Sequence, residues 1–108
     1  MEKKKQFVYV LRLIPRLHDD NNWTEKDEDI VNRHFLRLKR YTEEGKVILA
    51  GRTLNEASNS FGLVIFEAES EEEAIEFMKG DPTVAEGIMT AQVFPYSVAL
   101  MRKEKYII

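Results

Sequence analysis

The order in which strand and helix patterns follow one another constrains the fold of this chain most. The expected elements occupy residues 7–13, 25–44, 46–51, 61–67, 71–79 and 88–100. The first, third, fourth and last have the β-branched and aromatic residues typical of strands, and the other two have helical periodicity. The order strand, helix, strand, strand, helix, strand belongs to the ferredoxin-like split βαβ arrangement. The sequence therefore predicts an α+β ferredoxin-like βαββαβ sandwich.

Clear boundary signals support both helices. Thr24 and Asp27 have the spacing of a capping box, and Gly45 suits the left-handed end of a helix. Ser70, followed by three glutamates, predicts the start of the second helix, and Gly80-Asp81-Pro82 predicts its end.

Two of the predicted strands are apolar on both faces. In residues 7–11 and 61–66, apolar side chains occupy both odd and even positions, so they point to both faces of the sheet. Two helices can cover only one face of a four-stranded sheet, so the second face also needs burial. We therefore predict a homodimer that packs its sheet faces together.

Length and composition restrict the remaining possibilities. A chain of 108 residues fits one domain, residues 1–108, with a single core. The net charge of −3 argues against nonspecific binding to nucleic acid or to anionic membranes. No apolar run is long enough to span a membrane, and the absence of cysteine excludes disulfides and thiolate chemistry. We expect a cytoplasmic protein, and no zinc pattern, phosphate loop or nucleophile elbow predicts a metal or a cofactor.

RNA-recognition modules share this fold and offer an alternative. Residues 8–13 and 60–66 are similar to the strands that carry base-stacking aromatics in those modules. Leu63 stands where a stacking aromatic is expected, Asn59-Ser60 replaces a basic residue and glycine, and the chain is acidic. RNA binding is therefore the less favoured hypothesis.

His34 stands in the apolar stripe of the first predicted helix. The stripe consists of residues with helical spacing, namely Ile30, Val31, His34, Phe35, Leu38 and Tyr41. A histidine there is either a core side chain bonded to a backbone carbonyl or a functional group. Asp81, 47 residues later, could supply a carboxylate to the imidazole, or could simply cap the turn that begins at Pro82.

Several segments together resemble the YciI-like (YCII-related) family. They are the runs 34–38, 44–51 and 67–70, the pair Glu73-Ala74, the dipeptide Asp81-Pro82 and Gly87. The resemblance covers nearly the whole chain and implies a dimeric α+β barrel, in which two ferredoxin-like protomers pair their sheets. In that family a His and Asp pair is proposed as the active site, and these roles correspond to His34 and Asp81. The chain departs from the family at Arg52, where proline is usual, and at Thr83, where an aromatic is usual, so its substrate is expected to differ.

The resemblance and the residues together suggest an enzyme that needs no cofactor. A His-Asp dyad would transfer protons in a lyase or isomerase step on a small organic acid or aromatic compound. Arg12 and Arg52 are candidates for binding a substrate carboxylate, and Tyr9 for pointing a hydroxyl into the cavity. The alternative is a non-catalytic ligand-binding or accessory protein that uses the same pocket.

Overall fold

The computed structural model describes residues 4–103 and has the predicted order of major elements. The strands are β1 (Lys5–Leu13), β2 (Val47–Arg52), β3 (Gly62–Ala68) and β4 (Met89–Pro95). The helices are α1 (Glu25–Glu43), α2 (Glu71–Lys79) and the short α3 (Pro82–Ala85), and two 3₁₀ turns, η1 (Pro15–His18) and η2 (Asp20–Asn22), precede α1.

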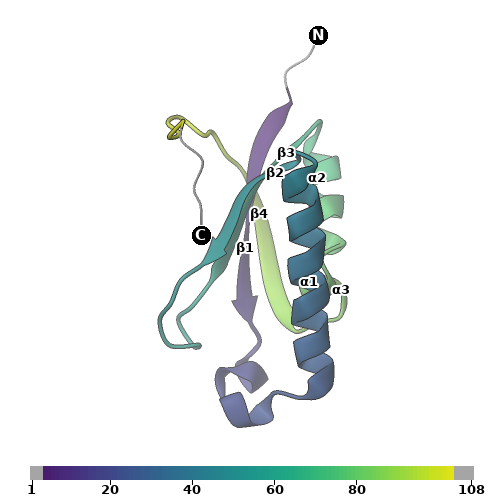
Figure 1. The fold of residues 1–108 in the computed structure, drawn as a ribbon, viewed down its shortest axis with the longest axis vertical. Coiled ribbons are helices and arrows are strands. Elements are labelled where there is room, and N and C mark those ends of the chain that lie inside the picture. The colour runs from purple at the N-terminus through teal and green to yellow at the C-terminus, as the bar shows by residue number, and fades with distance from the viewer. Residues whose placement is uncertain (1–3, 104–108) are drawn as a thin grey trace.

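The four strands form one sheet in the order β2-β3-β1-β4, and each neighbouring pair is antiparallel. Helices α1 and α2 lie side by side on the same face of this sheet (Figure 1). This arrangement confirms the predicted ferredoxin-like α+β fold.

The last strand is shorter than the sequence pattern indicated. Residues 88–100 were expected to be extended, but β4 ends at Pro95, which pairs with Phe7 on an edge of the sheet. Proline has no backbone N–H to continue the ladder, so edge positions and strand ends tolerate it best. Beyond Pro95, the chain contacts Gln6, whose backbone carbonyl accepts from Tyr96 N and whose Oε1 accepts from Val98 N.

The main core lies between the sheet and the two long helices. It is made of buried apolar side chains from β1, α1, β2, β3 and α2, namely Phe7, Tyr9, Leu11, Leu38, Val47, Val64, Phe66, Ala68, Ala74, Phe77 and Met78. The rings of Phe66 and Phe77 are 4.7 Å apart, and Tyr9 meets Phe66 edge-on at 5.6 Å. Both aromatic residues of β1 therefore point toward the helices, not toward the open face on which RNA-recognition modules stack bases.

The prediction that Phe35 belongs to the buried stripe of α1 was wrong. Ile30 and Leu38 are 1% and 7% exposed, whereas Phe35 is 61% exposed. Successive residues of a helix are turned by about 100°, so Phe35 leaves the face on which His34 lies between Ile30 and Leu38. The buried stripe is narrower than the sequence pattern, and His34 is at its centre.

An apolar row crosses the sheet face that carries no helix. The strand register places Leu49, Ile65, Val8 and Phe94 next to one another on this face, and we call these four residues the open-face row. Val8 and Ile65 on the central strands are each 8% exposed, but Leu49 and Phe94 on the edge strands are 48% and 45% exposed. The described chain thus leaves apolar surface uncovered where the sequence predicted a second apolar face.

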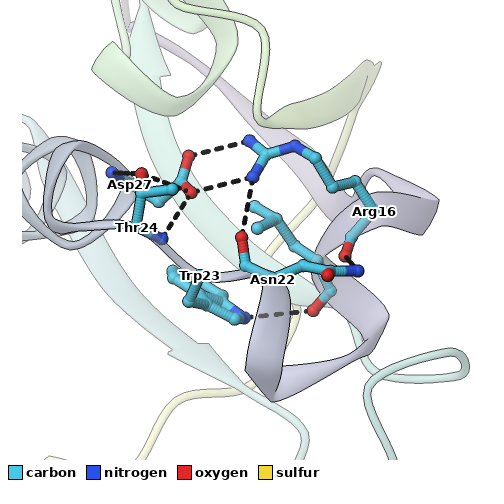
Figure 2. A network of polar contacts seen from close by, with 6 residues as sticks. Arg16, Asn22, Trp23, Thr24 and Asp27 are labelled. Atoms are coloured by element: carbon cyan, nitrogen blue, oxygen red, sulfur yellow. Dashed lines mark hydrogen bonds and ion pairs between the residues drawn. The ribbon is translucent and has the colours of Figure 1, made fainter.

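A polar network holds the segment that leads into α1 (Figure 2). Asp27 is 3% exposed and accepts two hydrogen bonds from the Arg16 guanidinium, at 2.9 and 2.8 Å. Arg16 also donates to the carbonyl of Asn22, and Trp23 Nε1 donates to the carbonyl of Leu17. Thr24 and Asp27 form the predicted capping box. The network fixes where α1 begins, and so it sets the rotation at which His34 meets the rest of the core.

Candidate active site

His34 and Asp81 meet where α1 passes the corner between α2 and α3. Asp81 is the N-cap residue of α3, directly after the C-cap Gly80 of α2. The Nδ1 atom of His34 is 2.8 Å from each carboxylate oxygen of Asp81. The fold therefore brings together two residues that stand 47 positions apart.

Asp81 is completely buried, and it accepts hydrogen bonds from Tyr9 and Thr83 in addition to its contact with His34. The hydroxyl of Tyr9 donates to Oδ2 at 2.7 Å. The backbone N–H and the hydroxyl of Thr83 both donate to Oδ1, at 3.0 and 2.7 Å. The capping role and the contact with His34, which the sequence offered as alternatives, therefore occur together in one carboxylate.

These contacts keep Asp81 ionised. Burial alone raises the pKa of Asp81, but the hydrogen bond and charge of His34, with the bonds from Tyr9 and Thr83, outweigh it and lower that pKa. An ionised carboxylate only accepts hydrogen bonds, so the Nδ1 atom of His34 must carry the proton that lies between the two groups. The neutral imidazole then has its free lone pair on Nε2.

The Nε2 atom of His34 is available to a ligand. Within residues 4–103 it makes no hydrogen bond, and it is not among the buried polar atoms that lack a partner. The His34 side chain keeps 16% of its surface exposed. An accessible nitrogen lone pair with a carboxylate behind the ring is the arrangement of a general base.

Tyr9 is a supporting residue of Asp81 in this structure. It is 0% exposed, and its hydroxyl is already engaged by the carboxylate. Burial, followed by the charge and hydrogen bond of Asp81, raises the pKa of Tyr9 far above its ordinary value, although Arg37 acts in the opposite direction. Tyr9 therefore remains a neutral donor at every physiological pH.

The two candidate arginines lie on opposite faces of the sheet. Arg52 pairs with Gly62, whose other neighbour Leu11 is in the helix-covered core, so Arg52 lies on the same face as Tyr9. Arg12 occupies the other face, with its guanidinium 5.0 Å from the centre of the Phe61 ring. The sheet thus separates Arg12 from the His34–Asp81 pair.

The end of β2 near Arg52 is not covered by α1. Ala50 pairs with the core residue Val64 and faces the helices, yet Ala50 and Arg52 are both exposed. Figure 1 shows the β2–β3 end of the sheet turning away from the lower half of α1. The Arg52 side chain makes no hydrogen bond or ion pair to another residue in the described range, so its guanidinium is available to a ligand.

Sequence reasoning missed the part that Arg37 and Thr83 play. Thr83 was noted only as a departure from the family pattern that could change the substrate, but it is fully buried and donates two hydrogen bonds to Asp81. Arg37 follows His34 by one helical turn and contacts the end of α2. Asp81 and Thr83 flank Pro82 with the spacing of a capping motif, and this pattern could have revealed the role of Thr83.

Comparison with protein families shows where the chain belongs. A family model described as the YCII-related domain matches residues 9–97. The chain is a member of the YCII-related family. No curated protein matches this YCII-related chain. Within its described residues, no group of three His, Cys, Asp or Glu side chains could hold a metal, and no helix is long and apolar enough to cross a membrane.

A solved structure shares the fold of this YCII-related protein. It is the 5-chloro-2-hydroxyhydroquinone dehydrochlorinase of Burkholderia phenoliruptrix AC1100, in complex with 2,5-dihydroxybenzoquinone. The similarity has a TM-score of 0.65 and covers 85% of this chain and 93% of the other, at 20% sequence identity. At this identity the similarity establishes the common fold.

Proposed function

We propose that this YCII-related protein catalyses a proton-transfer reaction on a small hydroxylated ring compound or organic acid, with His34 as the acid/base group and Asp81 as its partner. The observation that carries the proposal is the geometry of the His34 imidazole. Nδ1 is bonded to a buried, ionised carboxylate, while Nε2 has no partner among the described residues and reaches the surface. Such general acid/base catalysis typically contributes about 10²- to 10⁴-fold in rate.

The reaction type that suits this arrangement is an elimination or an isomerisation. Nε2 of His34 removes a proton from an O–H or C–H of the ligand, and the electron pair of that bond forms a new double bond. In an elimination, the leaving group departs with the electrons of its own bond. In an isomerisation, His34 returns the proton at another carbon. Asp81 stabilises the imidazolium that exists between the two steps.

Arg52 is the residue we propose for binding the acidic oxygen of the ligand. It lies on the face of the sheet that carries the pair, and its guanidinium is exposed and unpaired within residues 4–103. A guanidinium binds a carboxylate or a phenolate oxygen through parallel N–H donors. The structural neighbour was solved with a dihydroxybenzoquinone, a ring compound that carries acidic hydroxyl groups. Hydroxylated quinones and hydroquinones are therefore the first ligands to test.

We also propose that two copies pair through the open-face row. The row crosses all four strands on the face of the sheet that carries no helix. The exposed Leu49 and Phe94 at both ends of the row supply apolar surface for such an interface.

The decisive test is a panel of halogenated hydroquinones, hydroxyquinones and unsaturated lactones, incubated with the wild type and with His34→Ala. The wild type should remove a proton from these compounds or release their halide, and the rate should be at least about 100-fold lower in the variant. The matched control is His18→Ala, because His18 is the other histidine and its Nε2 is bonded to the carbonyl of Leu13. Equal turnover by wild type and His34→Ala would overturn the proposal, and tight binding with no turnover by either would favour the ligand-binding alternative.

A further inference from the structure

Arg37 and His34 reach the same corner of the fold from one turn of α1. The Nη2 atom of Arg37 donates to the carbonyl oxygen of Phe77 at 2.9 Å, in the last turn of α2. His34 binds Asp81, four residues after Phe77. The corner between α2 and α3 is therefore tied to α1 at two points, one before Gly80 and one after it.

Gly80 leaves the space that the Arg37 guanidinium occupies. A Cβ atom added to Gly80 would lie 2.8 Å from Nη2 of Arg37, which is closer than real Cβ contacts come. Gly80 has ordinary right-handed backbone angles, so its own conformation does not require glycine. The guanidinium thus lies directly against the backbone of the residue that precedes Asp81.

The orientation of the guanidinium is restricted on its other sides as well. Its central carbon lies 4.5 Å from the centre of the Phe77 ring and 5.2 Å from that of Tyr41. Arg37 also acts on Tyr9, since its charge opposes the rise in the pKa of Tyr9 that burial and Asp81 cause. A planar fork fits between these rings and the backbone in few orientations.

One nitrogen of Arg37 has an energetic cost. Nη1 is the only buried side-chain nitrogen or oxygen without a hydrogen-bond partner in residues 4–103. A buried donor without a partner destabilises the folded state. We therefore expect the other contacts of the Arg37 side chain to offset this cost. Those contacts are with the corner of the fold that carries Asp81.

We propose that Arg37 is a positioning residue for the His34–Asp81 pair. Its fork joins α1 to the Phe77 carbonyl and supports the backbone at Gly80, so that the Asp81 carboxylate stays within hydrogen-bond distance of Nδ1 of His34. The importance of this role rests on the function proposed for the pair. The positioning itself can be measured without any substrate.

The test compares Arg37→Met with Arg40→Met by amide hydrogen exchange. Methionine keeps much of the apolar stem but removes the fork. Arg40 is a matched control because it lies on the same helix, contacts the Tyr41 ring at 4.5 Å and pairs with Glu44 at the surface. The reporter is the amide of Thr83, which donates to Oδ1 of Asp81. We expect its exchange to become about tenfold faster in Arg37→Met and to change less than about twofold in Arg40→Met, with the amides of β1 and β3 unchanged in both.

A general loss of stability gives a different result. If the Thr83 amide and the amides of β1 and β3 become faster by the same factor, Arg37 stabilises only the whole domain and the proposal is wrong. An unchanged Thr83 amide also overturns it. Arg37→Lys is the second variant in case Arg37→Met does not fold, since it keeps one donor and the charge but not the planar fork. Its Thr83 amide should exchange at least about threefold faster than in the wild type, and a wild-type rate would contradict the need for the fork.

A second readout follows the imidazole itself. Nitrogen NMR of His34 should show one neutral tautomer, with the proton on Nδ1, in the wild type and in Arg40→Met, and a mixture of tautomers in Arg37→Met. A single Nδ1 tautomer in Arg37→Met would contradict the proposal. If His34→Ala keeps full turnover while Arg37→Met mixes the tautomers, the function proposed above fails and the positioning role stands. If His34→Ala loses turnover while Arg37→Met keeps a single Nδ1 tautomer, the proposed function stands and the positioning role fails.

Discussion

Tyr9 and Asp81, 72 residues apart in the chain, are joined by a buried hydrogen bond of 2.7 Å from the phenol to the carboxylate. Tyr9 lies on the central strand β1, and Asp81 on the corner that follows α2. This bond anchors the carboxylate to the sheet while His34 binds it from α1. The candidate site is therefore supported by both layers of the fold.

Removing the phenol should weaken the anchor of Asp81. Tyr9→Phe keeps the ring in the core but deletes a donor to a buried carboxylate, so we expect the free energy of unfolding to fall by about 1–3 kcal/mol. The pKa of Asp81 should also rise, because the phenol is one of the groups that lower it. Urea denaturation and carboxyl NMR measure the two effects. Tyr41→Phe is the control, since the Tyr41 hydroxyl makes no hydrogen bond within the described chain; a loss of equal size in both variants would contradict the prediction.

Acidification should destabilise the protein through Asp81 and Asp27. Hydrogen bonds from Arg16, followed by those from Thr24, lower the pKa of Asp27, and the contacts described above lower that of Asp81. The unfolded chain has the ordinary aspartate pKa of about 3.9, so it takes up protons before the folded chain does. The stabilisation that ionised Asp27 and Asp81 give the folded state is therefore complete above about pH 5. It is lost as the pH falls through the pKa values that these two groups have in the folded protein.

The variant Asp27→Asn tests this pH dependence. Unfolding free energies measured in urea between pH 7 and pH 3 should decrease less in Asp27→Asn than in the wild type, because the variant lacks one of the carboxyl groups whose pKa the fold lowers. The variant should also be less stable than the wild type at pH 7. Parallel curves for the two proteins would show that Asp27 does not contribute.

Arg52 and Arg12 provide a matched pair for ligand binding. If Arg52 binds the acidic oxygen of the ligand, Arg52→Ala should weaken the binding of a dihydroxyquinone about tenfold, as expected for a loss of about 1.4 kcal/mol. Arg12→Ala removes the same group from the opposite face of the sheet and should leave the dissociation constant within about twofold. Calorimetry of both variants decides the question, and equal losses would place the ligand elsewhere.

The open-face row predicts the oligomeric state. Light scattering at micromolar concentration should show a dimer for the wild type and a monomer for the double variant Leu49→Lys, Phe94→Lys, because two buried charges per protomer oppose the contact. Leu36→Lys is the control, since Leu36 is 53% exposed but lies on α1, on the helix-covered side. A monomeric wild type would contradict the prediction directly.

Local patterns were enough to predict much of the fold. The capping box of Thr24 and Asp27 and the start of α2 at Ser70 were both found from residue spacing, and both are present. The two-sided apolar character of β1 and β3 is present, with Val8 and Ile65 on the face without helices, and the homodimer predicted from it stays a prediction. The failures came where spacing alone does not determine a neighbour, as at Phe35, which has an apolar side chain at a helical interval but points away from the core.

By itself the sequence determined the order of the elements, because capping, periodicity and turn chemistry act between residues close together in the chain. The pairing of His34 with Asp81 was expected from the resemblance to the YCII-related family. The tertiary structure alone decided that Asp81 is both a cap and the partner of His34, that Tyr9 is turned inward to bind it, and that Arg12 and Arg52 are separated by the sheet. Each of these depends on strand register and on the rotation of α1 over the sheet. Those are set by packing and pairing between distant segments, which no local pattern contains.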